Sequence, residues 1–230
     1  MQLFCFTFAG GTAASFLQLE AACTPQIEVI KLEYPGHGLR YKEKLCDTFQ
    51  ELSKDLYDQI KGIYSGDEYA LMGYSMGSIA AFETLQYLLR MKELPCPQHI
   101  FLAAHGPKVV VDIEKYSSEA VDEYVKNQTI RFGGLPERLL NNKSFWRMYL
   151  PIYKADYLMI SRYDFDNLKF TSDISATIFY SKTDTPREEI GQWKKYFIVS
   201  CEFIEYTGTH FFINEHYMEM AALIKERLGV

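Results

Sequence analysis

Residues 69–78, YALMGYSMGS, decide how this chain of 230 residues folds. An apolar run at 69–72 leads into the pattern Gly73-Tyr74-Ser75-Met76-Gly77, and apolar residues with helical spacing follow from Ser78. A sharp turn from strand to helix needs residues without bulk on both sides of its central residue, and the two glycines meet this need. The stretch therefore predicts that Ser75 projects its hydroxyl from the end of a strand, next to the positive N-terminal end of a helix.

Similar apolar runs recur on both sides of this turn, and helical segments lie between them. Short runs with few polar breaks are typical of strands that are buried on both faces of a sheet. The predicted strands are 3–8, 27–32, 69–73, 99–104, 176–180 and 201–206. The predicted helices are 14–22, 48–62, 78–91 and 215–228. Because strands and helices alternate, we predict an α/β fold: a mainly parallel sheet with helices on both faces.

Residues from about 107 to 172 interrupt the alternation with helical-looking pieces and no convincing strand. No repeat and no linker rich in Gly, Ser or Pro divides the chain. We therefore predict a single domain over residues 1–230, with a helical lid inserted at about 107–172.

Composition excludes several classes of protein. Hydrophobic residues at 48% and charged residues at 23% are typical of a globular chain. A net charge of -6 argues against general binding to nucleic acid or to an anionic membrane. The 5 cysteines are odd in number and lack CxxC spacing, so we expect buried thiols in a reducing compartment and a cytoplasmic protein. The apolar N-terminus lacks the basic region of a signal peptide. We expect a monomer.

A serine of ordinary acidity needs a histidine base, and the base needs an acid to orient it. His210 stands in a short loop between the last predicted strand and the last helix, although plain surface exposure is the alternative. Asp184 follows the strand at 176–180, at the sheet edge where catalytic groups gather, although a turn residue is the alternative. The order Ser75, Asp184, His210 favours the catalytic interpretation. The weaker candidates for the acid are Asp156, Asp164, Asp166 and Asp173.

Acyl transfer also needs two backbone N–H groups that face the developing oxyanion. Met76 follows the nucleophile and offers one. Ala9, in the stretch Phe8-Ala9-Gly10-Gly11, offers the second, although a double glycine can equally be an ordinary turn. The chain has no GxxxxGK[ST], GxGxxG or HExxH pattern, so neither a metal nor an organic cofactor is implied.

Taken together, these residues resemble the type II thioesterases that accompany nonribosomal peptide and polyketide synthases, within the α/β-hydrolase superfamily. The resemblance spans almost the whole chain. It is carried by Phe8-Ala9-Gly10-Gly11 with Ser15-Phe16, Pro35-Gly36-His37-Gly38 with Arg40, Gly73-Tyr74-Ser75-Met76-Gly77, Phe132-Gly133-Gly134-Leu135-Pro136, Ala155-Asp156, Asp184 with Trp193, and Gly208-Thr209-His210-Phe211-Phe212. Thr7 stands where relatives often have proline, and Thr209 where a second glycine is common.

The resemblance implies hydrolysis of acyl or aminoacyl thioesters from the phosphopantetheine arm of carrier proteins, which clears stalled or misprimed synthases. Chain-releasing thioesterases, esterases of small molecules, and carrier-binding modules without activity are the alternatives. Releasing domains are usually fused to a synthase, whereas this chain begins and ends with its one predicted domain, which favours the editing enzyme. The complete set Ser75, Asp184 and His210 argues against an inactive module.

The predicted lid has two features that relate to such a substrate. Between residues 126 and 162 it carries seven basic and two acidic side chains, and we expect Arg138, Lys143 and Arg147 to attract an acidic carrier protein. A solvated helix face with neighbouring acids is the alternative. Apolar residues of the lid are candidates for the wall of an acyl channel, with packing of the lid onto the core as the alternative: Trp146, Met148, Tyr149, Leu150 and Ile152.

Overall fold

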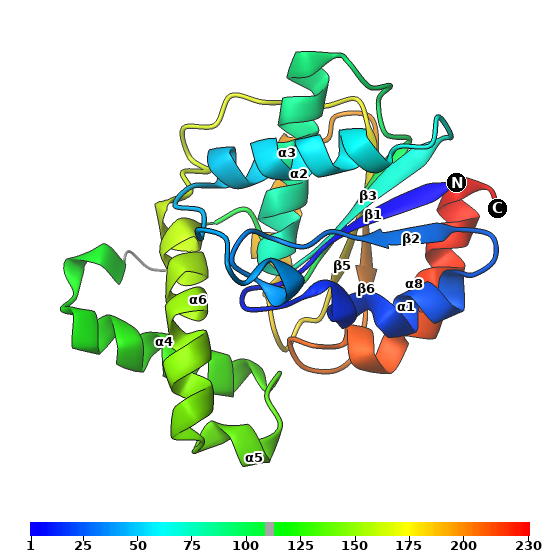
Figure 1. Cartoon of the computed structure of the whole chain (residues 1–230). Coiled ribbons are helices and arrows are strands. Elements are labelled where there is room, and N and C mark those ends of the chain that lie inside the picture. Colours follow the sequence, from blue (N-terminus) through cyan, green and yellow to red (C-terminus); the bar gives the residue numbers. More distant parts are fainter. Residues whose placement is uncertain (109–112) are drawn as a thin grey trace.

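Six parallel strands form one sheet in the computed structural model, which describes residues 1–108 and 113–230 (Figure 1). The strand order is β2-β1-β3-β4-β5-β6. The strands are β1 (Gln2–Phe6), β2 (Glu28–Lys31), β3 (Tyr69–Tyr74), β4 (His99–Ala103), β5 (Ser175–Tyr180) and β6 (Cys201–Glu205). The prediction of a parallel α/β sheet is confirmed, with strand ends shifted by up to two residues.

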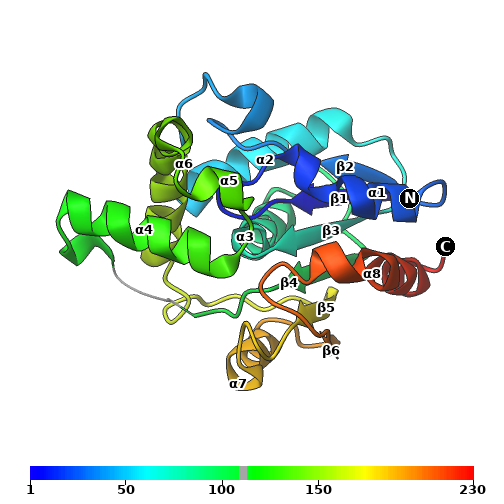
Figure 2. The ribbon, with the colours of Figure 1, turned by 90° about the horizontal axis from the view of Figure 1, so that it is seen from below.

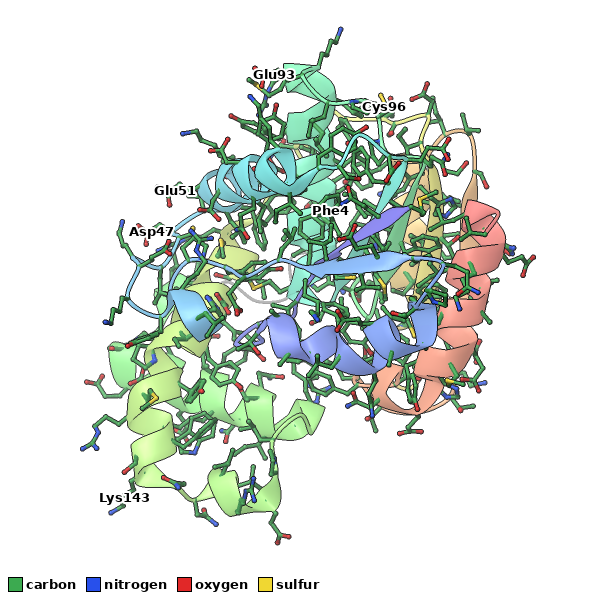
Figure 3. All side chains as sticks on the ribbon, turned by 45° about the vertical axis from the view of Figure 1, so that its right-hand side comes forward. Phe4, Asp47, Glu51, Glu93, Cys96 and Lys143 are labelled. Carbon is green, nitrogen blue, oxygen red and sulfur yellow. The ribbon has the colours of Figure 1, made fainter. Side chains whose placement is uncertain are left out.

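Four helices cover the two faces of this sheet: α1 (Leu17–Cys23), α2 (Phe49–Ile63), α3 (Met76–Met91) and α8 (Ile213–Leu228). In β1, Phe4 and Phe6 face the apolar cluster of α2 and α3. Leu3 and Cys5, one residue out of phase, face the cluster of α1 and α8. This alternation explains why the strands read as unbroken apolar runs. Figure 3 shows Phe4 inside the molecule.

Three helices between β4 and β5 form the lid: α4 (Ser118–Phe132), α5 (Glu137–Leu140) and α6 (Lys143–Arg162). They lie at one side of the molecule, and the two chain ends lie together at the other (Figures 1 and 2). Of the predicted insertion at 107–172, residues 109–112 lie outside the described residues. The described remainder holds these helices, a 3-10 turn at Ile113–Lys115 and a single bridge residue, Ser172.

The lid has a small apolar core of its own, in which Trp146 of α6 packs with Val121 and Val125 of α4. The remaining helical pieces are short: η1 (Ala13–Phe16), η2 (Gly38–Arg40), α7 (Arg187–Ile190) and η4 (Gly191–Lys195).

The strand order places β1 between β2 and β3. The connection after β1 leads to β2 on one side of β1, and the connection after β2 leads back across to β3 on its other side. A crevice forms at the carboxyl ends of strands where the order reverses in this way. The loops after β1 and β3 therefore meet at one place, which the lid covers.

Candidate active site

Ser75 sits at the turn between β3 and α3 with a backbone φ of 55° and ψ of -120°. This left-handed conformation is strained for a residue with a side chain, and such strain occurs at functional sites. The flanking glycines allow close packing: a Cβ on Gly73 would lie 2.6 Å from the Cα of Ser78, and one on Gly77 would lie 2.6 Å from the carbonyl oxygen of Thr7. Neither position accepts a side chain unless the backbone shifts.

The structure brings the three predicted catalytic side chains together. The Oγ atom of Ser75 lies 2.9 Å from Nε2 of His210, and Nδ1 of His210 lies 2.9 Å from each carboxylate oxygen of Asp184. All three are largely shielded from solvent, with 9% of Ser75, 7% of His210 and 6% of the Asp184 side chain exposed. Because Nδ1 faces a carboxylate, it carries the proton and donates it, which leaves the lone pair of Nε2 directed at the serine hydroxyl.

Neighbouring groups hold the loop that carries His210. The hydroxyl of Tyr74 donates to the carbonyl oxygen of His210 at 2.6 Å, and it accepts from the N–H of Ile213. Burial raises the pKa of Tyr74 well above its usual value, so this donor stays protonated. The Phe132 ring of α4 stacks on the imidazole, with ring centres 4.1 Å apart. His210 is thus held by Tyr74 of the sheet on one side and by Phe132 of the lid on another.

The loop after β1 supplies the other predicted group. Ala9 lines the same cavity as Ser75, and Met76 is the first residue of α3. Gly10 adopts a φ of +68°, and the N–H of Gly11 donates to the carbonyl oxygen of Phe8. The close approach of Gly77 to this loop sets it beside the N-terminus of α3.

A cavity of about 380 Å³ opens beside Ser75. One wall consists of the triad residues and the segments that follow β1, β4 and β5, and the lid supplies the other. The lid residues that line the cavity are Tyr124, Gln128, Thr129, Arg131, Phe132, Gly134, Leu135, Tyr153, Tyr157, Ile160 and Ser161. The site is mostly apolar and aromatic with a few polar groups, as is typical of pockets for organic ligands.

The predicted wall residues of the lid are wrong. The face of α6 that lines the cavity carries Tyr153, Tyr157 and Ile160, whereas Trp146 packs in the core of the lid and Met148 is 68% exposed. Tyr149, Leu150 and Ile152 are likewise absent from the lining. Helical periodicity gave the spacing of a face but not which face turns toward Ser75.

Asp156, a weaker candidate for the acid, lies elsewhere in the site. It is 1% exposed on α6, and its Oδ2 accepts hydrogen bonds from the N–H of Gly10 at 2.7 Å and from Nε2 of His37 at 2.9 Å. Asp156 is therefore not the acid of the triad, and the sequence patterns assigned no role to His37. The signal that marked them was the similarity of Pro35-Gly36-His37-Gly38 and Ala155-Asp156 to the family pattern. Asp164, Asp166 and Asp173 are exposed residues outside the cavity lining.

Of the remaining histidines, His99 and His216 lie outside the cavity lining, whereas His105 belongs to it. His99 on β4 contacts Thr177, and burial lowers its pKa to about 4. His105 lines the cavity, and burial lowers its pKa also to about 4. His216 lies in α8 beside Thr207. Among the five histidines, His210 alone is hydrogen-bonded to Ser75.

The basic residues of the lid are unevenly distributed. Lys154 pairs with Asp122 of α4, and Arg162 pairs with Glu114, so neighbouring acids neutralise part of the predicted surplus. Arg138, Lys143 and Arg147 are exposed at the corner formed by α5 and α6, and no carboxylate in the described part of the chain lies within ion-pair distance of them. Figure 3 shows Lys143 at the tip of the lid. We call these three residues the basic corner.

The five cysteines are free thiols. Cys5 and Cys23 are buried as expected, but Cys46 and Cys201 are half-buried and Cys96 is exposed, so that expectation was too broad. Within residues 1–108 and 113–230 no cluster of metal-ligating side chains occurs, and no helix there is long and apolar enough to cross a bilayer.

Comparison with known proteins decides the family. The model of the thioesterase domain matches residues 1–228. The chain belongs to the thioesterase domain family. It is 24% identical to thioesterase PikA5 of Streptomyces venezuelae, over 100% of this chain and 82% of that protein. It is 25% identical to gramicidin S biosynthesis protein GrsT of Aneurinibacillus migulanus, over 99% of this chain and 89% of that protein.

Solved structures agree with this assignment. The thioesterase chain is similar to ClbQ from the colibactin NRPS/PKS pathway, with a TM-score of 0.87 and 26% identity over 99% of this chain and 96% of that one. The predicted resemblance and the predicted α/β-hydrolase fold are confirmed. Membership of the family makes this thioesterase a hydrolase.

Proposed function

We propose that this protein is a serine thioesterase that removes acyl and aminoacyl groups from the phosphopantetheine arm of carrier proteins, and so clears stalled or misprimed synthases. The observation that carries the proposal is the continuous set of hydrogen bonds from Ser75 through His210 to Asp184, inside a cavity covered by a lid. The similarity to PikA5, GrsT and ClbQ supports the substrate class.

Acylation follows from the geometry of these groups. His210 takes the proton of the Ser75 hydroxyl while its oxygen attacks the thioester carbonyl carbon, and Asp184 stabilises the imidazolium that results. The N–H groups of Ala9 and Met76 donate to the carbonyl oxygen as it becomes negative. The carbon–sulfur bond then breaks, and His210 returns the proton to the departing thiolate.

Deacylation repeats these steps with water as the nucleophile. His210 takes a proton from water, the hydroxide attacks the ester carbon, and the Ser75 oxygen leaves and regains its proton. The products are a free carboxylic acid and the free thiol of the arm. The aromatic and aliphatic walls of the cavity hold the acyl group during both steps.

We further propose that the basic corner guides the carrier protein. Arg138, Lys143 and Arg147 project into solvent, and Leu135, just before α5, lines the cavity. Opposite charge on an approaching carrier raises the rate of encounter and fixes its orientation. The free thiols are consistent with a cytoplasmic setting, which we also propose.

The test of the activity uses carrier proteins loaded with short acyl, aminoacyl and long peptidyl groups, and follows unloading by intact mass. Ser75→Ala is the control, and we expect it to lower kcat about 10⁶-fold. Rapid clearance of the short groups is the expected result. Selective release of the long group would point to a chain-releasing enzyme, and retained binding without any clearance would point to an inactive module.

The test of docking reverses charge with Arg138→Glu and Arg147→Glu together. Hydrolysis of carrier-bound substrate should slow, while a small free thioester is hydrolysed as before. A matched variant with Lys54→Glu and Lys195→Glu changes the net charge equally at exposed positions outside the lid. An equal loss with both substrates, or an equal loss in the matched variant, would contradict guidance by the corner.

A further inference from the structure

One buried carboxylate links the lid to two loops, by an ion pair with His37 after β2 and by a hydrogen bond from Gly10 after β1. Asp156 of α6 is 1% exposed and His37 is 3% exposed. The Oδ2 atom of Asp156 accepts from Nε2 of His37 at 2.9 Å and from the N–H of Gly10 at 2.7 Å. Segments that are 146 residues apart in the sequence therefore share one carboxylate oxygen. Neither His37 nor Asp156 lines the cavity. Their hydrogen bonds go to Gly10, to Pro35 and to each other, and none goes to a triad residue.

The surroundings of His37 favour its protonated form. Its Nδ1 lies 3.0 Å from the carbonyl oxygen of Pro35 and its Nε2 lies 2.9 Å from Oδ2 of Asp156, an arrangement that suits an imidazolium donating from both nitrogens. Burial lowers the pKa of His37, but Asp156, the Pro35 carbonyl and Glu33 outweigh burial and raise it above its usual value. Tyr34 packs its ring edge-on against the imidazole, and Tyr153, Tyr157 and Cys46 are further titratable groups that interact with Asp156. Burial raises the pKa of Tyr34, so it stays neutral.

The loop that receives this link is fixed at both ends. The hydroxyl of Tyr34 donates to the carbonyl oxygen of Thr7 at 2.8 Å. Three residues later, Asp156 accepts from the N–H of Gly10, and the ring of Tyr153, one helical turn before Asp156, packs against Gly10. Ala9 lies between the two fixed points. Its N–H direction therefore depends on where α6 is docked.

We propose that His37 and Asp156 are positioning residues: their ion pair holds Gly10, aims the N–H of Ala9 at the oxyanion, and couples docking of the lid helix to catalysis. This inference rests on the proposed function, because it assumes that Ala9 serves the oxyanion. Asp156 without its partner would be a buried, uncompensated charge, and the pair also stabilises the docked position of α6. A site whose lid has moved away would thus lose its oxyanion donor.

The size of the effect follows from geometry. Loss of an oxyanion donor costs about 10²- to 10³-fold in kcat, and a misplacement of about 1 Å costs up to about 10²-fold. Asp156→Ala frees Gly10 but leaves the donor in place, so we expect kcat to fall about 10- to 100-fold. Asp156→Asn can still place an oxygen that accepts from Gly10, but it loses the charge that pairs with His37, so its kcat should lie between that of Asp156→Ala and the unaltered protein.

The experiment separates positioning from general loss of structure. It measures kcat and KM on a small acyl thioester, and the affinities for two inhibitors. A trifluoromethyl ketone forms a tetrahedral adduct with Ser75 and needs the oxyanion donors, whereas the corresponding thioether binds without reacting. His99→Gln serves as control, because His99 is also buried and hydrogen-bonded but lies on β4 away from the site.

In Asp156→Ala we expect affinity for the ketone to fall in parallel with kcat, while KM and affinity for the thioether change less than about threefold. His37→Ala should behave alike, and it keeps the test usable if Asp156→Ala does not fold. Unaltered kcat in the Asp156 and His37 variants would overturn the inference. Equal loss of ketone and thioether binding would also overturn it, because it indicates a structural defect. Failure of the unaltered protein to hydrolyse any thioester would instead remove the proposed function itself.

Discussion

Replacing Gly10 with alanine tests how tightly the lid packs on the loop beside Ser75. Gly10 has a φ of +68°, which disfavours any residue with a Cβ. A Cβ at this position would lie 2.6 Å from Cζ and 2.5 Å from Cδ1 of Tyr153. Tyr153 is 8% exposed in the lid core, so it has little room to turn away.

Two contributions set the size of the effect. The left-handed backbone costs an alanine about 1–2 kcal/mol. Overpacking against a confined ring costs about 1–3 kcal/mol more. We therefore expect Gly10→Ala to lower the free energy of unfolding by about 2–5 kcal/mol. Because relief requires movement of Tyr153 or of the loop, kcat should also fall about 10-fold or more.

Two other glycines serve as controls for these contributions. Gly133 ends α4 with a φ of +81° and has no neighbour within 4 Å of an added Cβ, so Gly133→Ala measures backbone strain alone. Gly62 lies in α2 with no neighbour within 4 Å and an ordinary φ, so Gly62→Ala should stabilise the protein by about 0.5–1 kcal/mol.

Urea unfolding and hydrolysis of a small thioester measure the three variants. The packing contribution is the difference between Gly10→Ala and Gly133→Ala. If Gly10→Ala costs no more than Gly133→Ala and keeps full activity, the loop and α6 are not packed as the structure shows, and the reasoning fails.

Three further outcomes are expected. Asp184→Ala should lower kcat on the order of 10⁴-fold with little change in KM, measured on a small thioester, because His210 loses its orienting partner; a fall of less than tenfold would remove Asp184 from the triad. Burial lowers the pKa of His99 to about 4, so below pH 6.5 the imidazole binds a proton in the unfolded chain but not in the folded protein. The free energy of unfolding should therefore fall by about 3 kcal/mol as the pH drops toward 4, and urea unfolding of His99→Gln should lack this decline. Asp156 raises the pKa of His37, so the stability that the protonated His37 contributes is complete below pH 6.5 and is lost as the pH rises through the pKa of His37 in the folded protein. Urea titrations of His37→Gln should show no such loss of stability at higher pH. An unchanged loss in this variant would contradict the ion pair.

Local patterns were enough to predict the sheet and the turn at Ser75. Each predicted apolar run contains a strand, because a strand covered on both faces needs apolar residues throughout. The patterns placed element ends less well. The apolar run at 3–8 extends two residues beyond the end of β1, because Thr7 and Phe8 already belong to the loop beside Ser75. The helix α3 begins at Met76 rather than at Ser78.

Side chains that contact residues far away in the sequence were harder to predict. Asp184 and His210 were marked by their places after predicted strands, since the carboxyl ends of parallel strands share one edge. Asp156 had no such marker, because a carboxylate within a helix reads as a solvated residue. Only its contact with His37 and Gly10 explains why it is buried.

The α/β alternation, the tight turn at Ser75 and the chain order of the triad follow from the amino-acid sequence, because they depend on residue size, apolar spacing and strand ends. Which face of α6 lines the cavity, and which carboxylate meets which histidine, follow only from the packed fold. Those features depend on how the lid lies over the sheet, and helical periodicity repeats identically whichever way the helix is turned. Packing of Tyr153 against Gly10 and the shared oxygen of Asp156 select one orientation.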